Sequence, residues 1–479
     1  MEYHASLQLT TPGSRYSARQ KAGLALIGVG VLALLVMLVG NGALNPALTM
    51  GVGISGFLLG SGLLFADLLQ QPPGVNNNGV WFSGATARGM AGWIMGIVFT
   101  GFYIILYWAP SNLEQLVRGT DALSIALRGR PADQWFLYGL FYTLAILIMG
   151  ARMLIKYRDN RYQILRTISV MFFQLGLAFI IPSLLLLLNE PEFYFSYFWP
   201  LKYDYLWPST FSSLTQGPGL GIFLLFWTAV MTFVATPVLT YFYGKRWYCS
   251  WVCGCGGLAE TAGDPFRHLS DKSTKAWKVE RWMVHSVLVF VVVTTLTLWI
   301  NSWTGGGILG GLSQEFSRLY GFFIGLIFAG VIGVGFYPIM GSRVWCRFGC
   351  PMAAILGLLQ KYLSRFRITT NGGQCISCGN CSTYCEMGID VRWYAQRGQN
   401  IVRASCVGCG MCATVCPRGV LRLENGSMKA RYNGPVLIHH NDVSVQLDEA
   451  WQRERPLMPS VQEDLPILTD KDLGSPPVL

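Results

Sequence analysis

The sequence predicts a polytopic α-helical membrane protein that carries a small soluble α+β domain near its C-terminus. Hydrophobic residues make up 52% of the 479 residues and charged residues only 13%, whereas about 25% of the residues in a soluble domain are charged. Apolar stretches long enough to cross a hydrocarbon core recur along the chain, and about 20 residues suffice for one crossing. A polar, cysteine-rich segment follows the last of these stretches.

Eight apolar stretches are the candidates for transmembrane helices, and they begin near residues 22, 50, 90, 135, 167, 220, 282 and 319. Lys and Arg collect before the first stretch, between the fourth and fifth, between the sixth and seventh, and after the eighth. Because cytoplasmic loops carry an excess of Lys and Arg, these runs place both chain ends and the soluble domain in the cytoplasm. The net charge of +11 therefore reflects topology, and no nucleic-acid partner is expected.

The composition divides the chain into six parts. They are a cytoplasmic N-terminal segment (1–21), transmembrane helices 1–5 (22–188), an outer aromatic loop (189–219), transmembrane helices 6–8 with two Cys-x3-Cys motifs (220–366), a cysteine-rich domain (367–430) and a partly disordered tail (431–479). Tyr, Phe and Trp crowd the outer loop, which favours either an aromatic belt at the membrane surface or a docking surface for an outer partner. The role of helices 1–4 stays open.

The cysteine-rich domain repeats one spacing. Four cysteines follow the pattern C-x2-C-x2-C-x3-C, and the same pattern returns after a spacer. In two-cluster bacterial ferredoxins, three closely spaced thiolates of one run bind one [4Fe-4S] cluster and the fourth binds the other cluster. We therefore expect a ferredoxin-like domain with two [4Fe-4S] clusters. The expected ligand sets are Cys375, Cys378, Cys381 and Cys416 for one cluster, and Cys406, Cys409, Cys412 and Cys385 for the other.

Structural zinc is the alternative interpretation of these cysteines. Zinc sites use two pairs of ligands with a longer spacer, four per metal, and two identical sets of three plus one do not fit that pattern. One residue departs from the usual run, because Glu386 stands where the first motif would have Pro. We expect this difference to affect a turn or a cluster potential, but not a ligand.

A second set of cysteines lies at the cytoplasmic ends of the sixth and eighth stretches. The pattern G-x-R-x-aromatic-C-x-aromatic-x-C begins at Gly244 and again at Gly341, so the chain contains an internal repeat. Residues four apart share a helix face, so each motif can present two sulfurs to one site, and two motifs together supply the four thiolates of a cluster. The candidate ligands are Cys249, Cys253, Cys346 and Cys350, with Cys255 as a fifth thiol.

Buried free cysteines that pack as small hydrophobes are the alternative for this second set. The repeat favours a metal or redox role, as do Arg246 and Arg343, which stand three residues before each pair. A cation at that place can lower a thiol pKa or screen an anionic centre. The sequence thus predicts a third metal or redox site, and leaves open which metal it holds and whether there is one site or two.

The combination of membrane Cys-x3-Cys motifs with a following two-cluster ferredoxin resembles the membrane polyferredoxins of the NosR, NapH and CcoG (FixG/RdxA) type. The resemblance covers about residues 220–425. The motif that ends at Cys350-Pro351 matches the family closely, whereas Gly254 replaces Pro in the first motif. The resemblance implies an electron-transfer protein of the bacterial inner membrane. An outer flavin-binding domain of the NosR kind and a folded outer C-terminal domain of the CcoG kind are not evident.

These observations predict an electron-transfer subunit rather than a stand-alone enzyme. It would relay electrons between a cytoplasmic or quinone-pool partner and a membrane or periplasmic redox complex. The expected partners are membrane lipid, quinone, and subunits of a redox complex such as a cytochrome or a terminal reductase. Two alternatives stay open: a metalloreductase or assembly factor similar to CcoG, and a redox-sensing scaffold. The sequence does not define the donor, the acceptor, the direction of flow or the oligomeric state.

Overall fold

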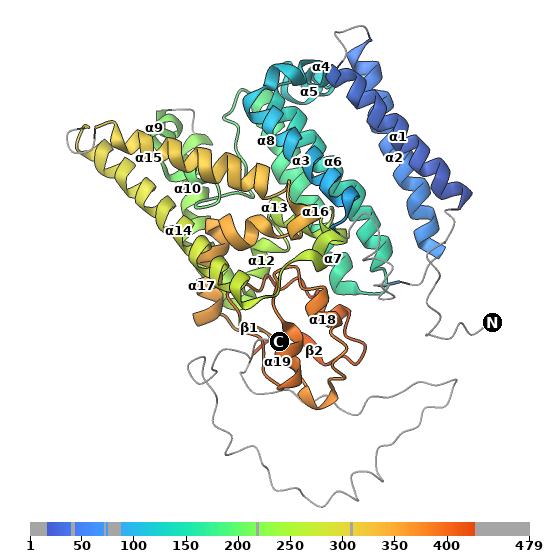
Figure 1. Cartoon of the computed structure of the whole chain (residues 1–479). Helices are drawn as coiled ribbons and strands as arrows, with labels where there is room; N and C mark the ends of the chain where they lie inside the picture. The colour runs from blue at the N-terminus through green and yellow to red at the C-terminus, as the bar shows by residue number, and fades with distance from the viewer. Residues whose placement is uncertain are drawn as a thin grey trace, which may run out of the picture. The chain divides into compact units, whose positions relative to one another are not determined.

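The computed structural model describes residues 17–39, 44–70, 73–74, 88–216, 220–306 and 310–426, and Figure 1 shows how its elements are arranged. Among these residues, eight helical segments are long and apolar enough to cross a membrane, which confirms the prediction. Their bounds are Ala18–Val39 (α1), Pro46–Gln70 (α2), Met90–Trp108 (α3), Gln134–Lys156 (α6), Arg161–Leu187 (α7 and α8), Leu220–Tyr243 (α10 and α11), Thr274–Trp303 (α14) and Leu312–Ile332 (from α15). The predicted tail over 431–479 and most of the segment over 1–21 lie outside the described residues.

One span begins well before its apolar stretch. Helix α14 starts at Thr274, although the apolar stretch begins near residue 282. Ser273 caps this helix, because its hydroxyl oxygen accepts the backbone N–H of Ala276 at 3.1 Å. Such a cap satisfies one of the N–H groups that the first turn leaves unpaired, so the polar and basic residues before the apolar stretch are helical too.

Helices α1 and α2 pack on each other through glycines. A side chain at Gly60 would meet the carbonyl oxygen of Gly23 at 2.6 Å, and one at Gly30 would meet that of Gly53 at 2.8 Å. Small residues let two helix backbones approach closely, which is the usual way helices associate within a membrane. These two helices therefore form a close antiparallel pair (Figure 1).

Three spans contain π-helical segments, at Phe173–Ile180, Met231–Ala235 and Gly321–Ile332. Such segments often occur near functional sites. The first contacts helix α13 (Gly254–Glu260), and the third contacts the π-helical segment Trp345–Gly349, which carries part of the second cysteine motif. Two of the irregular spans thus lie beside the membrane cysteines.

Short helices occupy the connections between spans and the segments around the cysteine motifs. They are Glu114–Arg118 (α4), Asp121–Arg128 (α5), Pro208–Gln216 (α9), Arg246–Cys249 (α12), Gly254–Glu260 (α13), Tyr337–Met340 (α16) and Pro351–Tyr362 (α17). In sequence, helices α4 and α5 lie between α3 and α6, and α9 lies in the aromatic-rich segment that precedes α10.

The soluble domain is α+β, as predicted. Strands β1 (Phe366–Thr370) and β2 (Leu421–Asn425) pair antiparallel, with Ile368 opposite Leu423. Three short helices lie between the strands in sequence, at Asn380–Thr383 (α18), Val391–Gln396 (α19) and Met411–Thr414 (α20). The segment between β1 and β2 therefore carries all eight cysteines of the ferredoxin pattern.

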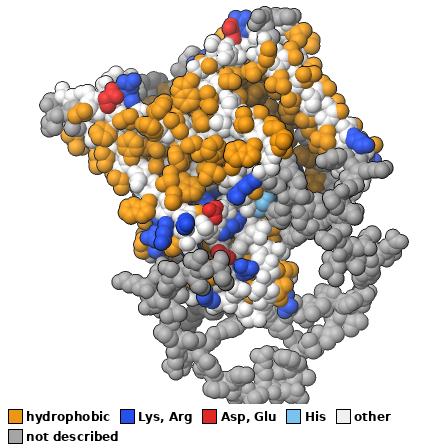
Figure 2. All heavy atoms as spheres, in the orientation of Figure 1, with side chains coloured by type: hydrophobic (Ala, Val, Ile, Leu, Met, Phe, Trp, Pro, Cys, Tyr) orange, Lys and Arg blue, Asp and Glu red, His pale blue; other side chains and the backbone are white. Residues whose placement is uncertain are grey.

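A large hydrophobic core joins this domain to the helices. It contains Phe366 and Ile368 of β1, Val287 and Val291 of α14, and all seven buried cysteines. On the outside, Figure 2 shows hydrophobic side chains gathered over the helical part, with Lys and Arg along its border with the soluble domain. A wide exposed apolar surface of this kind needs a partner other than water, and lipid around membrane helices provides it.

Candidate iron-sulfur site

The first group of thiols in the soluble domain surrounds one cavity. Cys375, Cys378, Cys381 and Cys416 all line it. The last cysteine of the second run therefore lies beside the first three of the first run. Burial raises the pKa of Cys381 to about 12, and the neighbouring thiols add to this shift. The structure thus brings together the first set of cysteines that the spacing predicts.

The second group consists of Cys385, Cys406, Cys409 and Cys412. Burial raises the pKa of Cys412 well above its ordinary value, and the thiols of Cys409, Cys406 and Cys385 are the next causes in order. Cys381 of the first group contributes to the same shift, so the two groups are neighbours. The fourth cysteine of each run therefore lies in the group formed by the other run, which is the crossed arrangement of a two-cluster ferredoxin.

The same short turn builds both groups. Gly379 and Gly410 have φ values of 79° and 76°, and they directly precede α18 and α20, which carry Cys381 and Cys412. Glycine adopts such values without steric cost. The two repeats of the cysteine pattern thus fold into matching turns that present the third thiol of each run from a short helix.

The chemistry of this donor set fits iron-sulfur clusters. All eight cysteines are free thiols. The backbone N–H of Ile389 donates to Cys385 Sγ at 3.4 Å, and backbone N–H groups also hydrogen-bond Cys406 and Cys409. Such bonds are expected where a thiolate carries part of the negative charge of a cluster, and they tune its reduction potential.

The membrane cysteines form a third group. Cys249, Cys253, Cys346 and Cys350 are all buried. Burial raises the pKa of Cys350 well above its ordinary value, with further contributions from Cys346, Cys249 and Cys253, so the two repeats of the motif meet. The fifth thiol, Cys255, hydrogen-bonds to Cys253, and this bond is the largest cause of the raised pKa of Cys253.

The expectation that each membrane pair shares one helix face is wrong. Cys249 ends α12, and Cys253 precedes α13 with an extended backbone at φ −67° and ψ 125°. In the second motif Cys346 lies in a π-helical segment, and Cys350 precedes α17 at φ −87° and ψ 113°. The next residue, Pro351, disfavours a helical conformation at Cys350. Each pair therefore spans a helix break, and the spacing of four does not require a helix.

A glycine with positive φ begins each of the two motifs. Gly244 has φ 67° and follows the last residue of α11, whereas Gly341 has φ 95° and follows α16. A side chain at Gly341 would also meet the backbone nitrogen of Ser270 at 2.8 Å. These glycines end the preceding helices and turn the chain into the cysteine loops, which explains the first position of the repeat.

The two arginines of the repeat lie in different surroundings. Arg343 is fully buried, and its Nη1 donates to the carbonyl oxygen of Cys249 at 3.2 Å and to Cys346 Sγ at 3.6 Å. Arg246 instead lies over the ring of Phe366 at 4.5 Å. The prediction that both arginines approach the thiols is therefore correct for Arg343 and wrong for Arg246.

Lys245 takes the place expected of Arg246. Its side chain is buried, and its Nζ donates to the carbonyl oxygen of Ala404 at 3.3 Å. Burial raises the pKa of Cys249 to about 12, and the charge of Lys245 is the largest influence that lowers it. The sequence reasoning missed Lys245, although it directly precedes Arg246 in the motif.

Side chains from the membrane part hold the loop that carries the second thiol group. The donors are polar side chains, and every acceptor is a backbone carbonyl oxygen of this loop. The pairs are Tyr162 to Gly408 at 2.8 Å, Gln163 to Cys409 at 3.0 Å, Ser250 to Val407 at 2.8 Å and Gln360 to Cys406 at 2.8 Å. Backbone carbonyls buried without a donor are costly, so these four bonds fix the loop against the membrane cysteine motifs.

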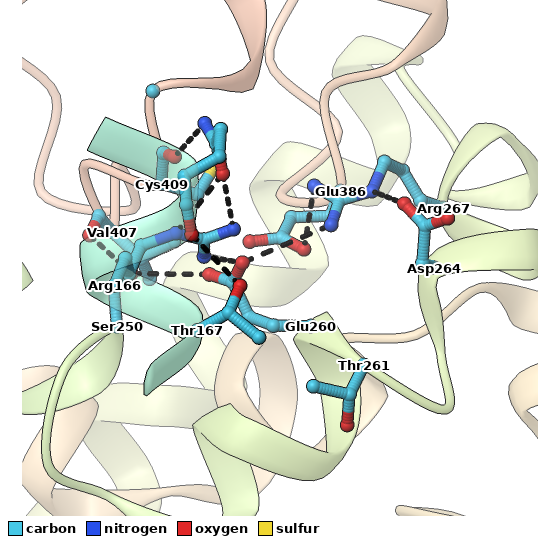
Figure 3. Close-up of polar contacts among 12 residues, drawn as sticks. Arg166, Thr167, Ser250, Glu260, Thr261, Asp264, Arg267, Glu386, Val407 and Cys409 are labelled. Carbon is cyan, nitrogen blue, oxygen red and sulfur yellow. Dashed lines mark hydrogen bonds and ion pairs between the residues drawn. The ribbon is translucent and has the colours of Figure 1, made fainter. Parts of the chain in front are cut away.

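Buried charges fill the space between the second and third thiol groups. Arg343 pairs with Glu260 at 2.5 Å and with Glu386 at 3.0 Å. Arg267 pairs with Glu386 at 3.1 Å, and Arg166 pairs with Glu260. Figure 3 shows Glu260, Glu386 and Arg267 turned toward one another near Cys409. We call Arg166, Glu260, Arg267, Arg343 and Glu386 the charge network.

Asp264 extends these contacts. Its carboxylate accepts Lys156 at 2.6 Å, Arg152 at 3.1 Å and Arg267 at 3.1 Å. Burial acts to raise the pKa of Asp264, but the three cations outweigh it and hold the pKa well below its ordinary value. The carboxylate is therefore ionised, and Arg267 links it to the charge network.

Sequence reasoning missed this network. The sequence pointed to Arg343 as a cation beside the thiols, but it offered Arg166 and Arg267 only as markers of membrane topology and Glu386 only as a replacement for Pro. One signal was present, because few acidic residues occur in the chain and two of them, Glu260 and Glu386, stand close behind cysteine motifs. Nothing in the spacing shows, however, that they meet in space.

Two family models match the chain. The 4Fe-4S dicluster domain matches residues 374–421, the segment of the first two thiol groups. The 4Fe-4S binding domain matches residues 225–273 and 320–370, the segments that carry the internal repeat. These matches, with the eight apolar helices, support a membrane polyferredoxin-type protein. The chain has 4Fe-4S domain matches over both its soluble and its membrane cysteines.

Two curated relatives are similar to this chain. YccM of Escherichia coli (strain K12), named for electron transport, is 27% identical over 158 residues, which are 31% of this chain and 43% of YccM. MauN of Methylobacillus flagellatus, named as a methylamine utilization ferredoxin-type protein, is 26% identical over 166 residues, which are 33% of this chain and 54% of MauN. The chain spans about half the length of these relatives. No solved structure matches it.

Proposed function

We propose that this polyferredoxin relays single electrons between a cytoplasmic or quinone-pool partner and a membrane or periplasmic redox complex. The observation that carries the proposal is that three groups of thiols, two soluble and one at the membrane helices, line one continuous core. Two separate domains would require a docking step between them. Here the loop of Cys406 and Cys409 is hydrogen-bonded directly to the membrane part.

Each soluble group would hold one [4Fe-4S] cluster. Cys375, Cys378, Cys381 and Cys416 form one ligand set, and Cys406, Cys409, Cys412 and Cys385 form the other, as the match to a dicluster domain supports. When bound, such a cluster takes up and releases single electrons over a wide range of potentials. The chain's own residues hold the thiols and donate N–H groups to them, and they bury Cys381, Cys406 and Cys412.

The membrane group would hold a third centre. Cys249, Cys253, Cys346 and Cys350 supply the four thiols that a further iron-sulfur cluster needs, and the match of the 4Fe-4S binding domain to both motifs supports that choice. Lys245 and Arg343 bring two positive charges to this group. These charges would offset the negative charge that four thiolates place in a buried site.

The orientation of the chain in the membrane is part of the same proposal. The excess of Lys and Arg in the loops supports a cytoplasmic soluble domain, in a chain that would lie in a bacterial inner membrane. Electrons would then enter or leave through the soluble thiol groups on the cytoplasmic side. A cytochrome or a terminal reductase, reached directly or through quinone, would be the partner on the membrane side.

The iron content of the purified protein tests this function. Iron and acid-labile sulfide are measured on anaerobically purified wild type, on a Cys249→Ser, Cys346→Ser double variant, and on Cys255→Ser as the matched control. We expect about twelve irons per chain in the wild type and in the control, and about eight in the double variant, since three four-iron clusters would require this. About eight irons in all three proteins would contradict a third cluster.

The contact of Cys255 with Cys253 favours a second candidate, a metalloreductase or assembly factor. A fifth thiol is not needed for a four-thiolate cluster, but it would suit a site that receives an incoming metal ion as substrate. In that case the membrane group binds copper or another ion reversibly, and Cys255→Ser abolishes this binding. A relay subunit should instead co-purify in a fixed ratio with a redox complex, and Cys255→Ser should have no effect.

A further inference from the structure

The charge network connects the second and third thiol groups through two side chains. One carboxylate oxygen of Glu386 and the sulfur of Cys409 lie within 4.8 Å of each other. Glu386 pairs with Arg343 at 3.0 Å, and Arg343 contacts Cys346 Sγ at 3.6 Å. Glu386 also directly follows Cys385 in the chain. A soluble thiol and a membrane thiol are thus joined by one carboxylate and one guanidinium.

The turn that carries Glu386 is held firmly. The hydroxyl group of Ser270 donates to the carbonyl oxygen of Glu386 at 2.7 Å. At Gly388, φ is 66°, and a side chain there would meet the carbonyl oxygen of Asp271 and the guanidinium of Arg347. The loop that follows the first membrane motif and the second motif itself therefore enclose this turn from both sides. A Pro at position 386 could not supply the carboxylate.

Glu260, Glu386 and Cys409 bring three possible metal ligands close together, but the surrounding charges exclude a cation there. Both carboxylates are already paired with arginines, and Arg343 pairs with both of them. Three buried guanidinium groups face two carboxylates, so the network carries excess positive charge before any ion binds. A divalent cation would have to displace these partners against electrostatic repulsion.

The arginines that carry the excess positive charge lie close to the thiol groups. Arg166 and Arg267 both interact electrostatically with Cys409, and Arg343 interacts with Cys346. Buried charges need compensation, and anionic centres held by the thiolates on either side would provide it. The two carboxylates limit this positive charge and keep the arginines in place. Removing either carboxylate should therefore change the electrostatic potential at both thiol groups.

We propose that Glu386 is a positioning residue for electron transfer between the soluble and membrane thiol groups. It lies within 4.8 Å of Cys409 and holds Arg343 beside Cys346, and its negative charge lowers the reduction potential of the centre that Cys385 and Cys409 would hold. This inference rests on the proposed relay function. Charge close to a redox centre acts strongly here because the site is buried and water screens little of it.

The variant Glu386→Gln tests the charge while keeping the shape and the hydrogen-bonding capacity of the side chain. Redox titrations followed by EPR compare it with wild type and with Glu424→Gln, which removes the same charge from β2, where Glu424 accepts from Thr369 at 2.7 Å. At a fixed ambient potential we expect the ratio of reduced to oxidised centre to rise at least tenfold in Glu386→Gln. For a one-electron couple this is a shift of about 59 mV to more positive potential. Glu424→Gln should titrate as wild type does.

Midpoint potentials in Glu386→Gln that equal those of wild type, with iron content unchanged, would overturn the proposal. If Glu386→Gln binds less iron than wild type, the same redox titration is made on Glu260→Gln. Glu260 also pairs with Arg343, but it does not follow a cysteine of the soluble runs in the chain. A positive shift in that variant supports the proposal, and its absence overturns it. Failure of the relay function is distinguishable, since it would appear in the wild type, as about eight irons per chain or as no electron exchange with any partner.

Discussion

At the scale of single residues, Arg343 and Arg246 hold the same position in the internal repeat but make different contacts. Arg343 is buried between Glu260 and Glu386, whereas Arg246 is half-buried over the ring of Phe366. Removing one partner from a buried ion pair costs about 3–5 kcal/mol, because the remaining charges stay uncompensated. The loss of a partly exposed cation–π contact costs about 1 kcal/mol or less.

We therefore expect Arg343→Gln to destabilise the protein strongly and Arg246→Gln to change its stability little. Thermal unfolding in detergent, followed through tryptophan fluorescence, measures the difference between these matched variants. Equal unfolding temperatures would mean that the charge network does not stabilise the fold. Iron content should be measured on both variants, so that loss of a cluster is not taken for loss of the ion pairs.

The residues of the candidate site differ in how far the sequence predicts them. Thiol ligands are predictable because cluster binding imposes short, fixed spacings on them. Glu260 and Arg343 are far apart in the sequence, and their pairing depends on how the loops pack. The same limit applies to Lys245 and Arg246, because adjacent side chains can point to opposite sides and the sequence does not show which one is buried.

At the scale of elements, the two positive-φ glycines that begin the membrane motifs should be essential. Gly341 has φ 95°, a value that other residues adopt only with strain of about 1–3 kcal/mol. Gly341→Ala should therefore destabilise the protein and displace Cys346 and Cys350, with loss of iron from the membrane group. The matched control is Gly62→Ala on α2, where nothing lies within 4 Å of an added side chain and alanine favours the helix.

Iron content and thermal unfolding of these two variants check the prediction. We expect Gly341→Ala to lose about four of twelve irons and the control to keep all of them, since one four-iron cluster depends on this turn. Full iron content in Gly341→Ala would show that the turn tolerates a side chain.

The elements also show which part of the fold is predictable. All eight spans are found from hydropathy, because membrane helices must satisfy their own backbone hydrogen bonds and expose apolar side chains to lipid. The helix breaks at Cys253 and Cys350 are not found, because a spacing of four fits both a helix and a tight loop. The early start of α14 is missed for a related reason: its first turns are polar, and only the Ser273 cap marks them.

At the scale of the whole molecule, the distribution of Lys and Arg predicts the orientation. Alkaline phosphatase fused after residue 303, at the end of α14, should be active because it would lie outside the cytoplasm. The same reporter fused after residue 426 should be inactive, and green fluorescent protein should show the opposite pattern. An active phosphatase at residue 426 would place the soluble thiol groups on the outer side and would contradict a cytoplasmic donor or acceptor.

The shared core makes a further prediction about metal removal. Thiols of all three groups pack in one core with residues of α14, α17 and β1, whereas α1 and α2 pack on each other through glycines. When metal binding stabilises a fold, its loss exposes the segments that carry the ligands. After iron is removed by a chelator under reducing conditions, hydrogen exchange should therefore increase in residues 244–260, 341–357 and 366–425 together, and stay unchanged in α1 and α2. An increase confined to 366–425 would show that the membrane thiols hold no iron, and that buried ion pairs and packing alone keep the two motifs together.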